Sequence, residues 1–208
     1  TAEVATVGAS GAQALTVRPS VNGTLTAKAY GLVTPTVSRQ SVDGVNVSFN
    51  PAAPVAAPGT GHFTVTVPAG TRAARFATFT SDHQLGTELD LYVYKDGTLV
   101  AQGPGGWADR AVTVTEPGTY EIFIPRFTLP GPQTQDVVLN TFLVPASPVG
   151  NLTATPASQP ATVGKGVPVN VTCWPAAMVT ADSPVTVSST QTRWVESAPT
   201  QKPSSAGT

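Results

Sequence analysis

Residues 88–100 constrain the fold of this chain more than any other stretch. They read ELDLYVYKDGTLV, so apolar and polar residues alternate with a period of two, an Asp-Gly pair follows, and a second short apolar run ends the segment. This pattern is typical of a β-hairpin with one buried face, because successive strand side chains point to opposite sides and Asp-Gly favours a tight turn. It predicts that Leu89 and Leu91 face a core, and that Glu88 and Asp90 share the opposite face.

Most of the remaining sequence consists of short β-type runs bounded by proline or glycine, with 20 Pro and 19 Gly among 208 residues. No window keeps a period of about 3.6 residues, so we expect essentially no helix. About a dozen strands at a spacing of roughly 8–12 residues predict an all-β chain folded as an antiparallel β-sandwich of jelly-roll type. The further expected strands are residues 14–17, 24–30, 44–49, 62–67, 74–79, 111–114, 119–124, 137–144, 151–155 and 167–172.

The low charge of the chain excludes several kinds of partner. Charged residues make up 11% of the sequence, against a usual value of about 25%. Eleven Lys and Arg balance twelve Asp and Glu, so we expect neither nucleic acid nor an anionic membrane surface as a partner. No apolar run approaches the roughly 18 residues of a membrane-spanning helix. The Thr-, Gly- and Pro-rich composition favours a secreted, extracellular module.

Several blocks of the sequence occur in a fixed order that matches a known family. They are Ala-Tyr-Gly-Leu-Val-Thr-Pro (29–35), Val-Thr-Val-Pro-Ala-Gly-Thr (65–71), Arg-Phe-Ala-Thr-Phe (75–79), the 88–100 hairpin, Gly-Gly-Trp-Ala-Asp (105–109), Val-Thr-Val (112–114) and Pro-Gly-Thr-Tyr-Glu-Ile (117–122). In these blocks the chain resembles the C-terminal β-sandwich region of actinobacterial subtilisin-like serine proteases, of the pre-peptidase C-terminal or fibronectin type III-like kind. The resemblance implies a non-catalytic accessory module that stabilises or docks on a parent protease domain, or binds an extracellular polymer or protein substrate.

The resemblance also sets the expected domain limits. The family usually has Asp where this chain has Glu88, and the match ends near Thr172. We therefore expect a linker or edge segment at 1–9, a β-sandwich module at 10–172, and an atypical tail at 173–208 whose last ten or so residues are disordered. An unclosed sheet edge near residue 172 would favour a homodimer formed by strand pairing.

Two short motifs offer a competing function, a small secreted serine hydrolase of esterase or lipase type. Ser10 lies in Gly-Ala-Ser-Gly-Ala, which departs from the nucleophile elbow at its last residue and leads into a strand rather than a helix. Ser81, Asp82 and His83 include the three residue types of a catalytic triad, with His62 as a second candidate base. Three consecutive residues rarely reach triad geometry, so we interpret them as a polar loop.

Four carboxylates form the candidate metal site. Ca²⁺ prefers six to eight oxygen ligands, and related modules sometimes bind it at this end of the sandwich. The alternative is a set of solvated carboxylates paired with Arg110 or Arg75. The candidate ligands for Ca²⁺ are Glu88, Asp90, Asp82 and Asp109.

Aromatic residues near the hairpin give a candidate binding platform for carbohydrate or peptide. Tyr92 and Tyr94 share the face of Asp90, where they are either exposed contact residues or anchors in the core, while Trp107 lies in a Gly-rich loop and is the preferred contact residue. A carbohydrate-binding module is therefore a third candidate function.

Overall fold

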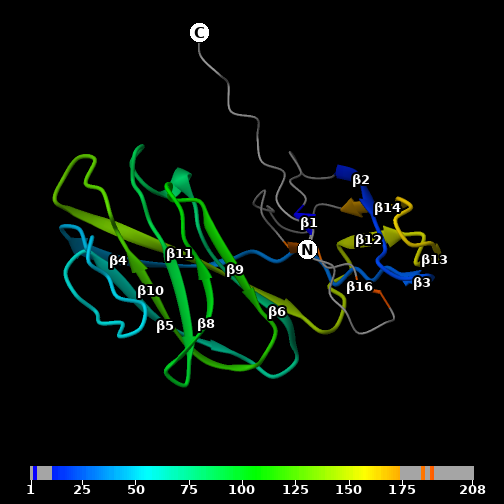
Figure 1. The fold of residues 1–208 in the computed structure, drawn as a ribbon, viewed down its shortest axis with the longest axis horizontal. Coiled ribbons are helices and arrows are strands. Elements are labelled where there is room, and N and C mark those ends of the chain that lie inside the picture. Colours follow the sequence, from blue (N-terminus) through cyan, green and yellow to red (C-terminus); the bar gives the residue numbers. More distant parts are fainter. Residues whose placement is uncertain (1, 4–10, 174–183, 186–187, 190–208) are drawn as a thin grey trace, which may run out of the picture. The chain divides into compact units, whose positions relative to one another are not determined.

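The computed structural model describes residues 2–3, 11–173, 184–185 and 188–189 (Figure 1). Ser10, most of the expected linker and most of the expected tail lie outside these residues. In the part that is described, the single helical element is one 3₁₀ turn, η1 (Thr80–Asp82), and no helix is long and apolar enough to cross a membrane. The chain divides into two compact units, residues 1–32 with 149–208 and residues 33–148. The second unit, which we call the inserted unit, therefore interrupts the sequence of the first.

The inserted unit is an antiparallel sandwich with jelly-roll strand order, which confirms the predicted fold class. One sheet has the order β5-β10-β7-β8 and the other β4-β11-β6-β9, and the chain passes between the sheets at most connections. The first sheet consists of β5 (Thr60–Val67), β10 (Gly118–Pro125), β7 (Leu91–Lys95) and β8 (Thr98–Gly103). The second consists of β4 (Thr36–Asp43), β11 (Thr134–Pro145), β6 (Thr71–Thr78) and β9 (Arg110–Val114).

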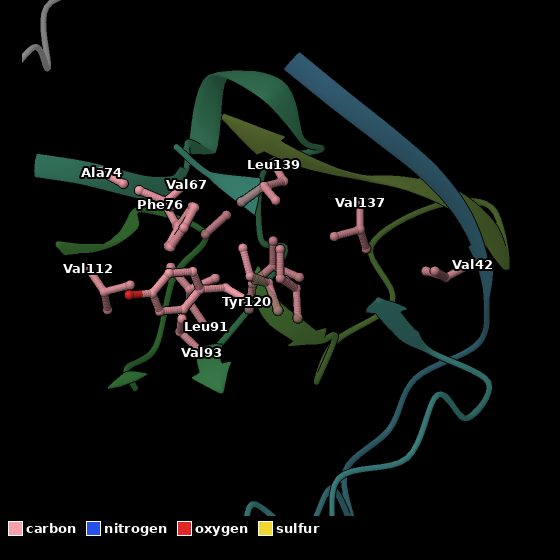
Figure 2. Packing of buried hydrophobic residues seen from close by; sticks show 14 residues of the cluster. Val42, Val67, Ala74, Phe76, Leu91, Val93, Val112, Tyr120, Val137 and Leu139 are labelled. Atoms are coloured by element: carbon pink, nitrogen blue, oxygen red, sulfur yellow. The ribbon is translucent and has the colours of Figure 1, made fainter. Parts of the chain in front are cut away.

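The core of the inserted unit lies between these sheets (Figure 2). The hairpin side chains predicted to face inward, including Leu89 and Leu91, are fully buried. Phe76 and Tyr120 pack across the core with their ring centroids 5.7 Å apart. Burying each large apolar side chain contributes about 1.5–3 kcal/mol. The hairpin turn has φ of 51° at Asp96 and 74° at Gly97, as a type I′ turn requires.

One expected strand is wrong. Residues 44–49 alternate in polarity but form no strand, and the strand at this point is β4, which ends at Asp43. The Asn46 side chain donates to Thr60 Oγ1 at 2.9 Å, and its backbone amide donates to the Arg126 carbonyl at 2.8 Å. These contacts hold the segment as a loop, so its alternation does not reflect sheet pairing.

Four longer connections of the inserted unit meet at one end of the sandwich. The register shows this, because Asp43 pairs with Thr134 and Thr60 with Pro125. Likewise, Leu91 pairs with Gly103 and Thr78 with Arg110. We call this end, made of loops 44–59, 79–90, 104–109 and 126–133, the four-loop end. The three short connections, residues 68–70, 96–97 and 115–117, lie at the other end.

The other unit contains two three-stranded antiparallel sheets, β12-β14-β2 and β13-β3-β16, and the short pair β1-β15. The strands of the first sheet are β12 (Leu152–Thr155), β14 (Val167–Cys173) and β2 (Gly11–Val17). The remaining strands are β13 (Ser158–Ala161), β3 (Gly23–Thr26), β16 (Ser188–Ser189), β1 (Ala2–Glu3) and β15 (Pro184–Val185). Thr172 does not lie at a sheet edge, because β14 pairs with β12 on one side and with β2 on the other. A homodimer through an open sheet edge stays a prediction.

Candidate functional site

Arg126 joins two of the loops at the four-loop end. Its side chain is only 1% exposed, and its Nε donates to the Gly44 carbonyl at 2.8 Å while Nη2 donates to the Gln133 carbonyl at 2.6 Å. Its backbone amide donates to the Gly59 carbonyl at 2.8 Å. Burial lowers the pKa of the Arg126 guanidinium, and the negative charge of Asp43 opposes that shift. Arg126 thus fixes both ends of loop 44–59 against loop 126–133. Its guanidinium holds the end at Gly44, and its backbone amide holds the end at Gly59.

Loop 79–90 is attached to loop 126–133 through Thr128. The Thr128 hydroxyl accepts a hydrogen bond from the Glu88 amide at 2.9 Å and donates to the Gly86 carbonyl at 2.7 Å. The amide of the preceding residue, Phe127, donates to the Glu88 carbonyl at 2.9 Å. These contacts involve the backbone of Glu88 and leave its carboxylate half-buried.

Loop 104–109 is held by Asp90, which is 8% exposed. Asp90 Oδ1 accepts from the Gly105 amide at 2.8 Å and Oδ2 accepts from the Tyr92 hydroxyl at 2.9 Å, while Arg110 Nε lies 4.0 Å away. At the other side of the loop, Asp109 Oδ1 accepts from the Thr80 amide at 2.7 Å. The loop is therefore fixed at both ends to the segment around loop 79–90.

Glycine is required at position 105, because the loop passes directly over Arg110. A Cβ atom added to Gly105 would lie 2.6 Å from Arg110 Nη2. The Arg110 Nε also donates to the Leu89 carbonyl at 3.0 Å, which fixes the guanidinium under the loop. The glycine at position 105 therefore serves a close backbone approach.

Large apolar side chains are exposed on all four loops. Trp107 is 59% exposed and Leu85 is 84% exposed. Six of the nine exposed large apolar side chains of the inserted unit belong to this set: Val45, Val47, Val55, Leu85, Trp107 and Leu129. Apolar side chains exposed together on fixed loops are a feature of binding surfaces.

The candidate catalytic residues do not form a triad. His83 Nδ1 lies 2.8 Å from the Phe79 carbonyl, and its Nε2 lies 3.2 Å from the Val138 amide. Because an amide can only donate, Nε2 accepts and Nδ1 carries the proton, so both ring nitrogens are bound to backbone. The Asp82 carboxylate accepts from Asn140 Nδ2 at 2.8 Å rather than orienting a histidine.

The second candidate base lies elsewhere, on β5. His62 Nε2 is 2.5 Å from Glu121 Oε2, and its ring stacks on Phe123 with centroids 4.3 Å apart. The Thr64 hydroxyl donates to the same Glu121 oxygen at 3.1 Å rather than to the imidazole, as a nucleophile would. Ser10 lies outside the described residues.

The four candidate Ca²⁺ ligands are distributed among different partners. Asp90, Asp109 and Asp82 each accept hydrogen bonds from separate donors. In the described part of the chain, no group of three or more His, Cys, Asp or Glu side chains is arranged to hold a metal ion. Burial lowers the pKa of Arg110 and three nearby carboxylates oppose that shift, which agrees with the alternative pairing of Asp90 with Arg110. Ca²⁺ binding stays a prediction.

Tyr92 and Tyr94 are buried, so of the two alternatives the core role holds and they form no exposed platform. The Tyr94 hydroxyl donates to the Pro51 carbonyl at 2.6 Å, and the Phe49 ring lies 5.0 Å from that of Tyr92. Loop 44–59 therefore covers this face of the hairpin, and sequence reasoning missed it. The isolated Phe49 within a Pro- and Ala-rich segment is the signal that could have indicated a covering loop.

Comparisons with known proteins provide no family assignment. Neither the protein-family models nor the curated proteins contain a match to this chain. Among solved structures, the chain has a weak similarity to the VP2 subviral particle of infectious bursal disease virus, with 12% identity and a TM-score of 0.19. That alignment covers 84% of this chain and 44% of the viral chain. The fold and geometry define this chain as a two-unit β-sandwich protein with a jelly-roll insertion.

Proposed function

We propose that this chain is a non-catalytic accessory module of a secreted subtilisin-like serine protease, and that its four-loop end binds the protein substrate of the parent enzyme. The observation that carries this proposal is the exposure of large apolar side chains, above all Trp107, on four loops that are hydrogen-bonded to one another. Binding to a surface that is already ordered loses less conformational entropy than binding to flexible loops. The ordered sequence blocks shared with the protease-appended sandwiches support the choice of parent enzyme.

The geometry around the candidate nucleophiles favours binding over hydrolysis. His83 is bound to backbone through both ring nitrogens, and Asp82 is bound to Asn140. A general base needs a free nitrogen within reach of the hydroxyl that it activates. Neither His83 nor Asp82 is positioned for that step. Their hydrogen bonds to Val138 and Asn140 instead attach this loop to β11.

Retention on an immobilised unfolded protein tests the proposal. Reduced, carboxamidomethylated lysozyme, an unfolded basic protein, immobilised on beads should retain the wild-type chain, and Trp107→Ala should weaken retention about tenfold, since a central aromatic contact contributes about 1.4 kcal/mol or more. Val37→Ala is the matched control, because Val37 is a similarly exposed apolar residue on β4, away from the four loops. Equal retention of all three proteins, or no retention of any, would contradict the proposal.

A further inference from the structure

The exposed charge of the four-loop end is acidic. Loop 44–59 contains no charged residue, and loop 126–133 contains only Arg126, which is buried. The other two loops contain no lysine or arginine. Their carboxylates are the buried Asp90, the half-buried Asp82 and Glu88, and the exposed Asp109.

The positive charge of Arg110 leaves this acidic character in place. Arg110 lies at the start of β9, is half-buried beneath Gly105, and donates to the Leu89 and Asp109 carbonyls. Its single charge faces three carboxylates, those of Asp90, from which Nε is 4.0 Å away, of Asp109 and of Glu88, so one positive charge stands against three negative ones. Glu88 and Asp109 therefore add negative charge to the end of the sandwich that also exposes Trp107.

From this combination we infer that the bound polypeptide is one in which apolar side chains alternate or mix with lysine or arginine. One of its cationic side chains rests on the Trp107 ring beside Asp109 and Glu88. The inference rests on the proposed function and specifies its substrate class. An indole ring attracts a cation within about 6 Å of its face. Carboxylates at the rim of such a contact favour basic ligands and disfavour acidic ones.

Asp109 is placed to serve this contact. It is two residues from Trp107 on the same loop, and the hydrogen bond from the Thr80 amide fixes one of its oxygens. Both side chains are exposed, and Asp90 fixes the Gly105 end of their loop. The ring and the carboxylate are thus held on one ordered loop of six residues, 104–109.

A protein ligand agrees with the observations better than a polysaccharide or a lipid surface. Sugar rings stack on exposed aromatic faces, but Tyr92 and Tyr94 are buried, and the other exposed apolar side chains of the four loops are valines and leucines. A bilayer surface attracts proteins through lysine and arginine near the inserted side chains, and these loops expose carboxylates instead. Valine, leucine and tryptophan side chains match the apolar residues of an extended peptide.

Fluorescence anisotropy with two matched peptides tests the inference. One labelled ten-residue peptide combines leucine, glycine and lysine, and the other has glutamate in place of each lysine. We expect the wild-type chain to bind the lysine peptide at least about tenfold more tightly in low salt, and this ratio to fall as salt is added. Trp107→Ala should weaken binding of the lysine peptide about tenfold.

The charge variants separate the acidic rim from the fold. Glu88→Gln with Asp109→Asn should reduce the preference for lysine over glutamate to about twofold or less, and asparagine retains the acceptor for the Thr80 amide. Glu116→Gln, on the short connection 115–117 at the other end, is the matched control and should leave the preference unchanged.

Three outcomes would overturn the inference. If both peptides bind equally while retention on the unfolded lysozyme still depends on Trp107, the substrate class is wrong and the proposed function stands. If the Glu88→Gln, Asp109→Asn protein keeps its melting temperature and its full lysine preference, the acidic rim has no role. If zwitterionic phosphatidylcholine vesicles bind and neither peptide nor the unfolded lysozyme does, both proposals fail.

Discussion

Asp90 shows at the scale of one residue what the sequence could and could not predict. Period-two alternation correctly placed Leu89 and Leu91 in the core and Asp90 on the opposite face. It could not show that loop 44–59 covers that face, because the cover depends on contacts between segments far apart in the chain. Asp90 is therefore a buried acceptor for Tyr92 and Gly105 instead of a solvated carboxylate.

The hydroxyl of Tyr92 gives a pH-dependent prediction. Burial, followed by the hydrogen bond to Asp90, raises the pKa of Tyr92 to about 12, whereas an unfolded tyrosine titrates near 10. The neutral hydroxyl is thus favoured by the fold. Its contribution to the free energy of unfolding is fully present below pH 10 and is lost as pH rises from about 10 to 12.

Urea unfolding at pH 8, 10 and 11 measures this loss. Tyr92→Phe should be less stable at pH 8 by about 1–2 kcal/mol, because Asp90 loses a buried donor. Its stability should then fall less steeply above pH 10 than that of the wild type. Part of the fall should remain, since burial also raises the pKa of Tyr94 and Tyr120. Parallel pH profiles for the two proteins would contradict this account.

At the scale of elements, hairpins and strands with a buried face were predictable and the connections were not. The hairpin of β7 and β8 and its Asp-Gly turn follow from local pattern and turn chemistry. Residues 44–49 alternate in polarity as a strand does, although they form a loop. The boundary between the two units is not marked by a change in composition, because both units consist of the same kind of short strands. The Asn151 side chain and the Val149 amide, which donates to the Tyr30 carbonyl at 2.7 Å, hold the segment that resumes the first unit after the insertion.

Asn151 connects the two ends of the interrupted unit. Its Oδ1 accepts from the Leu32 amide at 2.8 Å, its Nδ2 donates to the Leu32 carbonyl at 2.9 Å, and the side chain is buried. Asn151→Asp replaces the Nδ2 donor with an acceptor and buries a charge, so we expect a loss of about 1–3 kcal/mol in the free energy of unfolding. Urea denaturation checks this, with the exposed Asn170 on β14 changed to Asp as control. Equal midpoints for the two variants would refute the role of Asn151.

At the scale of the whole molecule, the inserted unit separates its chain connections from its exposed loops. The last strand of this unit, β11, ends at Pro145, and the next amide, that of Ala146, donates to the Gly70 carbonyl beside the short connections. The four-loop end lies at the opposite end of the same sandwich. Within this unit, the first strand begins and the last strand ends at the end of the sandwich that holds the short connections, and loops 44–59, 79–90, 104–109 and 126–133 lie at the other end.

The central claim, that the four-loop end is the binding surface, is tested most directly by mapping where a ligand contacts the chain. In a ¹H–¹⁵N NMR titration of the full chain with the lysine-containing peptide, the largest shift changes should fall on the four loops. The Trp107 indole N–H should be among them, and strands β2, β12 and β14 should show little change. Changes concentrated on those strands or along β8, with the four loops unaffected, would contradict the account.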